Sequence, residues 1–193
     1  MEDVEAWFDR VGAYVKTHAQ SHGVILRHYL ISSGLTEIIE GERRIRHQPP
    51  VLVPLDSPEW HDIAQDVLDR YAESMNEEHV QLLRRFRLVE IAMKVVGVGS
   101  VGTRCLIALL HGRDEDDVLF LQVKEAEHSV LAPYAGASAQ DHQGERVVVG
   151  QRLMQAASDM FLGWTVGPFG NHYYVRQLRD MKGSVAIDGL PPE

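Results

Sequence analysis

The chain has 193 residues, 45% of them hydrophobic and 24% charged, which are the values of a soluble globular protein of about one domain. Its formal net charge of −9 argues against a general nucleic-acid-binding or anionic-membrane-binding surface. The single cysteine, Cys105, excludes an intramolecular disulfide, and the acidic start of the chain differs from a secretory signal. We therefore expect a cytoplasmic protein with no nucleic-acid and no membrane partner.

Residues 1–87 are expected to form a helical extension. Apolar side chains at helical spacing predict an amphipathic helix over 4–19. The segment 36–47 has the pattern of a short hairpin that turns at Glu40. Prolines make 48–54 an extended connector, because each proline disfavours helix in the residue before it.

Two more helices and a strand are predicted before the glycine-rich segment. Ser57 and Pro58 have the residue types of an N-cap and a first-turn proline, so a helix is expected to begin there. Ser74 and Glu77 have the spacing of a capping box, which predicts a second helix start at Ser74. The apolar segment 88–96 then favours a strand.

A Gly-x-Gly-x-x-Gly segment follows this strand and is the strongest functional signal in the sequence. Glycines at this spacing let backbone N–H groups approach a phosphate chain without side-chain obstruction. Lys124, at the end of the apolar run 118–124, would supply a positive charge to the same phosphates. The segment therefore suggests a nucleotide site. Its candidate residues in the loop are Gly97, Gly99, Ser100 and Gly102.

Two folds are compatible with this segment. In the first, 103–110 is a strand and 118–124 returns antiparallel, as in the glycine-rich loop and lysine strand of a kinase-like small lobe. In the second, 103–110 is a helix that faces a pyrophosphate, and 118–123 is the next parallel strand of an NAD-type dinucleotide-binding domain. In that second fold Glu125 would bind the ribose. In a third alternative the glycines serve packing only, in a non-catalytic structural or interaction domain.

The C-terminal half favours the first fold. A long helix is predicted over 142–164 and a hairpin over 163–178. Glu145, near the start of the helix, is the candidate to pair with Lys124 and hold it toward the phosphates. The expected architecture is α+β, with a kinase-like nucleotide-binding lobe over 88–185. A tail over 186–193 follows it.

Four segments resemble a bacterial family catalogued as domain of unknown function 2252, and the resemblance covers roughly residues 35–185. These segments are Lys94–Arg104, Leu119–Ala126, Gly150–Asp159 with Phe161–Trp164, and Tyr174–Ser184. The family is similar at a distance to protein-kinase-like and aminoglycoside-phosphotransferase-like enzymes. The resemblance therefore implies ATP or a related nucleotide, with Mg²⁺, as the ligand.

The chain departs from the family pattern in one respect. Family members carry a Gly-Asp-x-His segment with a following Asn-Phe, and an Asn-Asp-Phe-Asp segment, which resemble a phosphotransferase catalytic loop and metal-binding acid. Neither occurs here, so the sequence assigns no catalytic residue and no metal ligand, and leaves open whether the chain is an enzyme. We expect a fragment or shortened member that binds nucleotide without turnover, with the missing catalytic portion as a partner.

Overall fold

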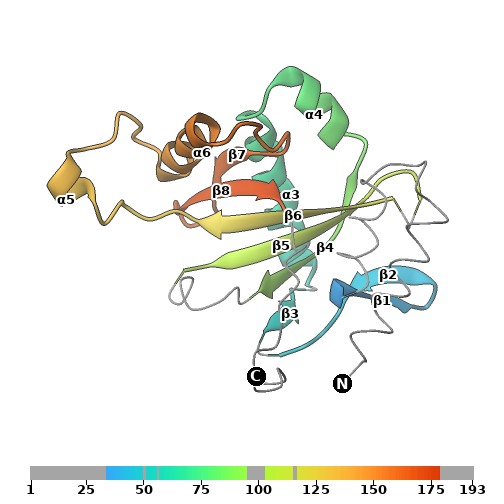
Figure 1. The fold of residues 1–193 in the computed structure, drawn as a ribbon. Coiled ribbons are helices and arrows are strands. Elements are labelled where there is room, and N and C mark those ends of the chain that lie inside the picture. The colour runs from blue at the N-terminus through green and yellow to red at the C-terminus, as the bar shows by residue number, and fades with distance from the viewer. Residues whose placement is uncertain (1–33, 50, 56, 95–102, 115–116, 179–193) are drawn as a thin grey trace, which may run out of the picture. The chain divides into compact units, whose positions relative to one another are not determined.

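Figure 1 shows the fold as a computed structural model, which describes residues 34–49, 51–55, 57–94, 103–114 and 117–178. Leu35–Leu178 form one compact unit, and the boundary expected after residue 87 falls within it. The helix expected over 4–19 and the tail over 186–193 lie outside the described residues. So do four candidate site residues, Gly97, Gly99, Ser100 and Gly102.

A six-stranded sheet forms the centre of this unit, and its strands lie in the order β3-β4-β5-β6-β8-β7. Every neighbouring pair is antiparallel, and helices pack on the sheet, so the expected α+β class is confirmed. The strands are β3 Leu52–Pro54, β4 Arg87–Lys94, β5 Cys105–His111, β6 Val118–Glu125, β7 Gly163–Val166 and β8 His172–Gln177.

The segment 103–110 does not form the helix of the dinucleotide interpretation. Cys105–His111 is a strand that pairs antiparallel with β6 along its whole length, so the helix and the parallel strand of that interpretation are wrong. All but one of the seven residues of β5 are buried. A short apolar run without an amphipathic stripe suits a strand that is covered on both faces, which explains the outcome.

The predicted first hairpin is confirmed as β1 Thr36–Ile39 paired with β2 Glu42–Ile45. Glu40 and Gly41 occupy the turn with φ angles of 54° and 88°. Two consecutive positive φ angles are what a two-residue hairpin turn of the right twist requires. The Ile45 backbone N–H donates to the Glu90 carboxylate at 2.6 Å, which ties β2 to β4.

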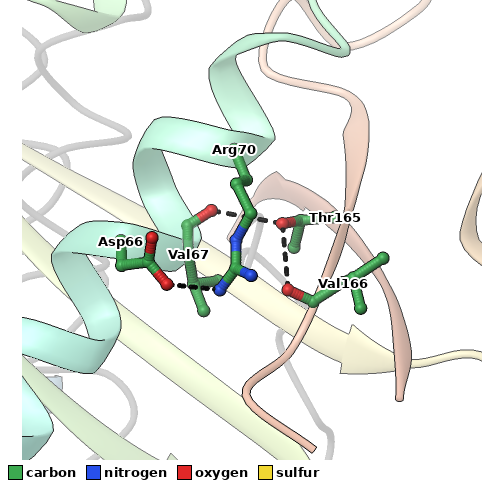
Figure 2. Close-up of polar contacts among 5 residues, drawn as sticks. All are labelled: Asp66, Val67, Arg70, Thr165 and Val166. Carbon is green, nitrogen blue, oxygen red and sulfur yellow. Dashed lines mark hydrogen bonds and ion pairs between the residues drawn. The ribbon is translucent and has the colours of Figure 1, made fainter. Parts of the chain in front are cut away.

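The helix predicted to begin at Ser57 is α3, Pro58–Ala72, and the Ser57 hydroxyl accepts the Trp60 N–H at 3.4 Å as an N-cap. Figure 2 shows how its last turns hold the edge strand β7. The Thr165 hydroxyl donates to the Val67 carbonyl at 3.2 Å, beside an Arg70–Asp66 ion pair. α3 is therefore anchored to the edge of the sheet.

The second helix, α4 Glu77–Leu83, begins later than the capping box predicts. The Ser74 hydroxyl does not cap a helix, because it donates to the Tyr71 carbonyl and accepts the Trp164 N–H at 2.8 Å. Ser74 thus joins the end of α3 to β7. The Ser74 hydroxyl therefore makes a tertiary hydrogen bond in place of the helix cap that the local pattern predicts.

The hydrophobic core lies between α3 and one face of the six-stranded sheet. Tyr71 is completely buried there, and its hydroxyl donates to the Phe161 carbonyl at 2.5 Å. Burial raises the pKa of the Tyr71 hydroxyl well above its ordinary range. Sheet residues of this cluster include Ile91, Ala108, Leu121, Val123 and Val175.

The long helix predicted over 142–164 is shorter in the structure. After the short helix α5 Ala132–Ala135, α6 spans Gln143–Met154, and the chain is extended at Gln155. The Asp159 carboxylate accepts the Phe161 N–H at 2.9 Å and the Gln177 N–H at 2.8 Å, and so holds a turn where the helical pattern continued. The predicted hairpin is confirmed as β7 and β8.

In the part of the chain that the structure describes, no helix combines the length and the apolar character that a membrane crossing requires.

Candidate functional site

Lys124 lies on a central strand, with a neighbour on either side. Its register partners are Cys105 on β5 and Tyr174 on β8. Directly opposite residues of antiparallel strands point to the same face of a sheet, so these three side chains share one face. By the same alternation Lys94 and Arg176 also belong to it. We call this side of the sheet the lysine face; the core cluster lies on the opposite face.

The lysine face gathers positive charge. Burial raises the pKa of the Cys105 thiol, and the charges of Lys124, Lys94 and Arg176 oppose this rise. The Arg176 guanidinium donates twice to the Gln122 side-chain oxygen, at 3.1 and 3.0 Å, and is thereby fixed in place. Lys124 forms no ion pair with a carboxylate of the described residues. Three cations around one thiol make this face suitable for an anion.

In the chain, the glycine-rich segment lies between two strand residues of this face. It follows Lys94, the last residue of β4, and is succeeded by β5, whose first residue, Cys105, lies opposite Lys124. Both ends of the segment are therefore held within one or two strands of Lys124. The glycines themselves lie outside the described residues, so their approach to a ligand stays a prediction.

α6 packs beside β7 and β8 (Figure 1). Two ring contacts place it on the side of the sheet that carries the lysine face. The His142 ring at its start stacks on His172 with centroids 4.0 Å apart, and Arg152 in its last turn lies 5.9 Å above the Trp164 ring. By register, His172 and Trp164 are on the same face as Tyr174, and hence as Lys124.

Glu145 is the third residue of this helix and is half-buried. Its backbone N–H donates to the His142 Nδ1 at 3.1 Å. Among the ion pairs of the described residues, none joins Glu145 to Lys124. The structure thus places both residues on one side of the sheet without joining them, and the role of Glu145 stays a prediction.

Glu125 follows Lys124 and points to the opposite face. Its carboxylate accepts N–H groups from Arg104 and Asn171, and its side chain is only 7% exposed. These bonds occupy the carboxylate that the dinucleotide interpretation assigned to a ribose. Sequence reasoning missed Gln122, Asn171 and Arg176, because the partners in these bonds are 46 and 54 residues away in the chain, where no local pattern marks them.

Two cavities lie against α3 and away from Lys124, and a third of about 480 Å³, lined by Glu125, Gln143, Asn171 and His172 among others, lies at the end of β6 that carries Lys124. One of about 520 Å³ lies between α3 and α4, and an apolar one of about 260 Å³ lies between α3 and the core face, with Trp60 and Tyr173 among its walls. The lining of this second cavity is almost entirely apolar, and the Tyr71 hydroxyl and the Arg104 guanidinium at its walls already have partners. The chemistry that the residues support is therefore on the lysine face.

Two histidines hold the start of α6. The His142 Nδ1 accepts the Glu145 N–H, and the His172 Nδ1 accepts the Gln143 N–H at 2.9 Å. Both acceptors require an unprotonated nitrogen, and a positive charge at a helix N-terminus is unfavourable. Burial lowers the pKa of His142, His172 lowers it further, and Glu145 opposes both.

We expect the protein to lose stability on acidification because of His142. The pKa of His142 is lower in the folded than in the unfolded protein, so its contribution is complete above the unfolded value of about 6.5 and is lost as the pH falls below it. Urea unfolding at pH 7.5 and 5.5 measures the loss. His142→Asn caps the helix without titrating, and should lose less stability between these two values. An equal loss in both proteins would contradict this assignment.

The fold and the site define the class of protein: an α+β domain whose antiparallel sheet carries a cationic face beside a glycine-rich segment. The chain belongs to the family described as "Uncharacterized protein conserved in bacteria (DUF2252)", which it matches over residues 16–193. This confirms the family that the four sequence segments indicate. Comparison with curated proteins found no match, and comparison with solved structures found none either.

Proposed function

We propose that this chain binds an ATP-type nucleotide as the small-lobe half of a kinase-like phosphotransferase. The observation that carries the proposal is the position of Lys124. It lies on the fourth of the six strands, on the face where α6 packs, and opposite the first residue of the strand that follows the glycine-rich segment. A lysine so placed would act as a point charge on phosphates that the glycine backbone cradles.

The order of elements supports the same proposal. From β4 onward the strands lie in the order β4-β5-β6-β8-β7, and α6 connects the lysine strand β6 to the final hairpin. A kinase-like lobe has a glycine-rich loop, a lysine on the third strand and a glutamate on the helix that follows. Glu145, on α6, is in the element that this arrangement requires. We propose that it turns toward Lys124 when nucleotide binds.

We further propose that this chain does not transfer the phosphoryl group by itself. Phosphoryl transfer requires a carboxylate that orients the acceptor and acids that hold Mg²⁺ across the β- and γ-phosphates. The two family segments that resemble those groups do not occur in this sequence. A separate catalytic portion of the same fold would supply them, with ATP and Mg²⁺ as shared ligands.

Calorimetric titration of the chain with ATP in the presence of Mg²⁺, and in parallel with NAD⁺, tests the proposal. We expect ATP to bind weakly, with a Kd of roughly 0.1 to 1 mM because half of the site is missing, and NAD⁺ to bind no better than adenosine. The antiparallel pairing of β5 with β6 favours this outcome over an NAD-type domain. Tighter binding of NAD⁺ than of ATP would contradict the proposal. Absence of both would favour a structural or interaction domain.

A further inference from the structure

Glu125 joins three segments that are distant in the sequence. Its carboxylate accepts the backbone N–H of Arg104 at 2.9 Å, the Arg104 guanidinium at 2.9 Å and the Asn171 amide at 2.6 Å. Its own backbone N–H donates to the Arg104 carbonyl at 2.9 Å. Glu125 therefore contacts the residue before β5 through both its main chain and its side chain. Asn171 adds the turn between β7 and β8.

The hydrogen bonds of Glu125 are expected to contribute more free energy than an exposed ion pair does. Its side chain is 7% exposed, so water screens the bonds poorly and replaces them poorly when they are lost. All three donors reach an ionised carboxylate, and such charge-assisted bonds are roughly twice as strong as neutral ones. Removal of the carboxylate would leave the Arg104 N–H and the Asn171 amide without this acceptor.

We call the bonds from Arg104 and Asn171 to the Glu125 carboxylate the clamp. The clamp lies close to Lys124 in the sheet. Arg104 precedes Cys105, the register partner of Lys124, and Glu125 follows Lys124 directly. The clamp therefore closes the same end of the β5–β6 ladder at which Lys124 lies. Because its oxygens are occupied and negatively charged, Glu125 is unsuited to contact a phosphate, and its influence must pass through the backbone.

We propose that Glu125 is a positioning residue for Lys124: it holds the start of β5 opposite the lysine and couples that site to the turn at Asn171. The inference rests on the proposed nucleotide site for its consequence in binding. Its structural part, the fixed position of Lys124 relative to Cys105, is independent of any ligand.

The test compares the wild type with Glu125→Gln and Asn171→Ala. Glutamine keeps the shape of glutamate but loses the charge, and its NH₂ group replaces one acceptor oxygen with a donor. This NH₂ group would face at least one of the three N–H donors, which it cannot accept. We expect MgATP affinity to fall about tenfold in Glu125→Gln and about threefold in Asn171→Ala, which removes a single bond. Because Asn171→Ala leaves the ion pair intact, it keeps the test valid if Glu125→Gln fails to fold.

A matched control lies at the other end of the same hairpin. Asp117 also accepts a backbone N–H, that of Arg113 at 3.1 Å, and lies near the Arg113 guanidinium. Asp117→Asn should lower the melting temperature by removing a similar bond but leave MgATP affinity within about twofold, because it is six residues of strand away from Lys124. If Glu125→Gln acted only through a general loss of hairpin stability, MgATP affinity would fall equally in Glu125→Gln and Asp117→Asn.

Backbone amide shifts of Lys124 and Cys105 separate this inference from the proposed function. We expect both to move in Glu125→Gln and Asn171→Ala and to stay in place in Asp117→Asn. If the wild type binds MgATP but both clamp variants bind it within twofold of the wild type, the positioning role is overturned and the nucleotide site stands. If the wild type does not bind MgATP, the function fails, and unmoved shifts at Lys124 and Cys105 would then also overturn the positioning role.

Discussion

Replacement of Lys124 with alanine is expected to weaken MgATP binding about 10- to 100-fold. The side chain is half-buried on a face it shares with Lys94 and Arg176, and it makes no ion pair with a carboxylate of the described residues. A charged hydrogen bond to phosphate contributes about 1.5 to 3 kcal/mol, which corresponds to this range. Calorimetric titration measures the change.

The control for this variant is Arg113→Ala. Arg113 is a cation of the same hairpin, but its side chain is 90% exposed and it lies near the opposite end, about 20 Å away by the rise of the strand. The Arg113→Ala variant should bind MgATP with the affinity of the wild type. Equal affinities in wild type and Lys124→Ala, with binding present in both, would remove Lys124 from the site.

Replacement of Gly144 with alanine is expected to destabilise the fold by about 2 to 3 kcal/mol. Gly144 is buried in the first turn of α6, where the helix rests directly on β8. A Cβ there would overlap the Tyr173 carbonyl oxygen and lie 2.8 Å from its carbon, and these backbone atoms belong to a paired strand. The helix must therefore move away from the sheet. Urea denaturation measures the lost free energy of unfolding.

The same substitution at Gly150 is expected to have the opposite sign. Gly150 lies in the same helix, is exposed, and has no atom within 4 Å of the place where a Cβ would stand. Alanine there removes the entropic cost of glycine in a helix, so we expect about 0.5 to 1 kcal/mol of added stability. If both variants were destabilised alike, the close packing of α6 on β8 would not be the cause.

Elements whose signals are local were predictable from the sequence. The turn at Glu40 and Gly41 and the N-cap at Ser57 are confirmed where the residues indicate them. The apolar run from Cys105 left helix and strand open, because its residues are apolar on every side and no periodicity separates the two. Its antiparallel pairing with β6 decided for the strand.

Where a side chain has a distant partner, the local pattern failed. Ser74 has the spacing of a capping box, yet Trp164 uses its hydroxyl. The helical stripe beyond Met154 continues in the sequence, yet Asp159 holds a turn there through the Gln177 N–H. In each case one contact between segments far apart in the chain outweighed a local preference, because such preferences amount to only about 1 kcal/mol.

By itself the amino-acid sequence determined the family, the α+β class, most strands and the candidates Lys124 and Glu145, since composition, periodicity and motif spacing are properties of short stretches. Only the tertiary structure decided that Lys124 lies opposite Cys105 on a cationic face, and that Glu125 binds Arg104 and Asn171. The physical reason is strand pairing. A one-residue shift in register would turn every side chain of β6 to the other face, and register is set by contacts across the whole sheet.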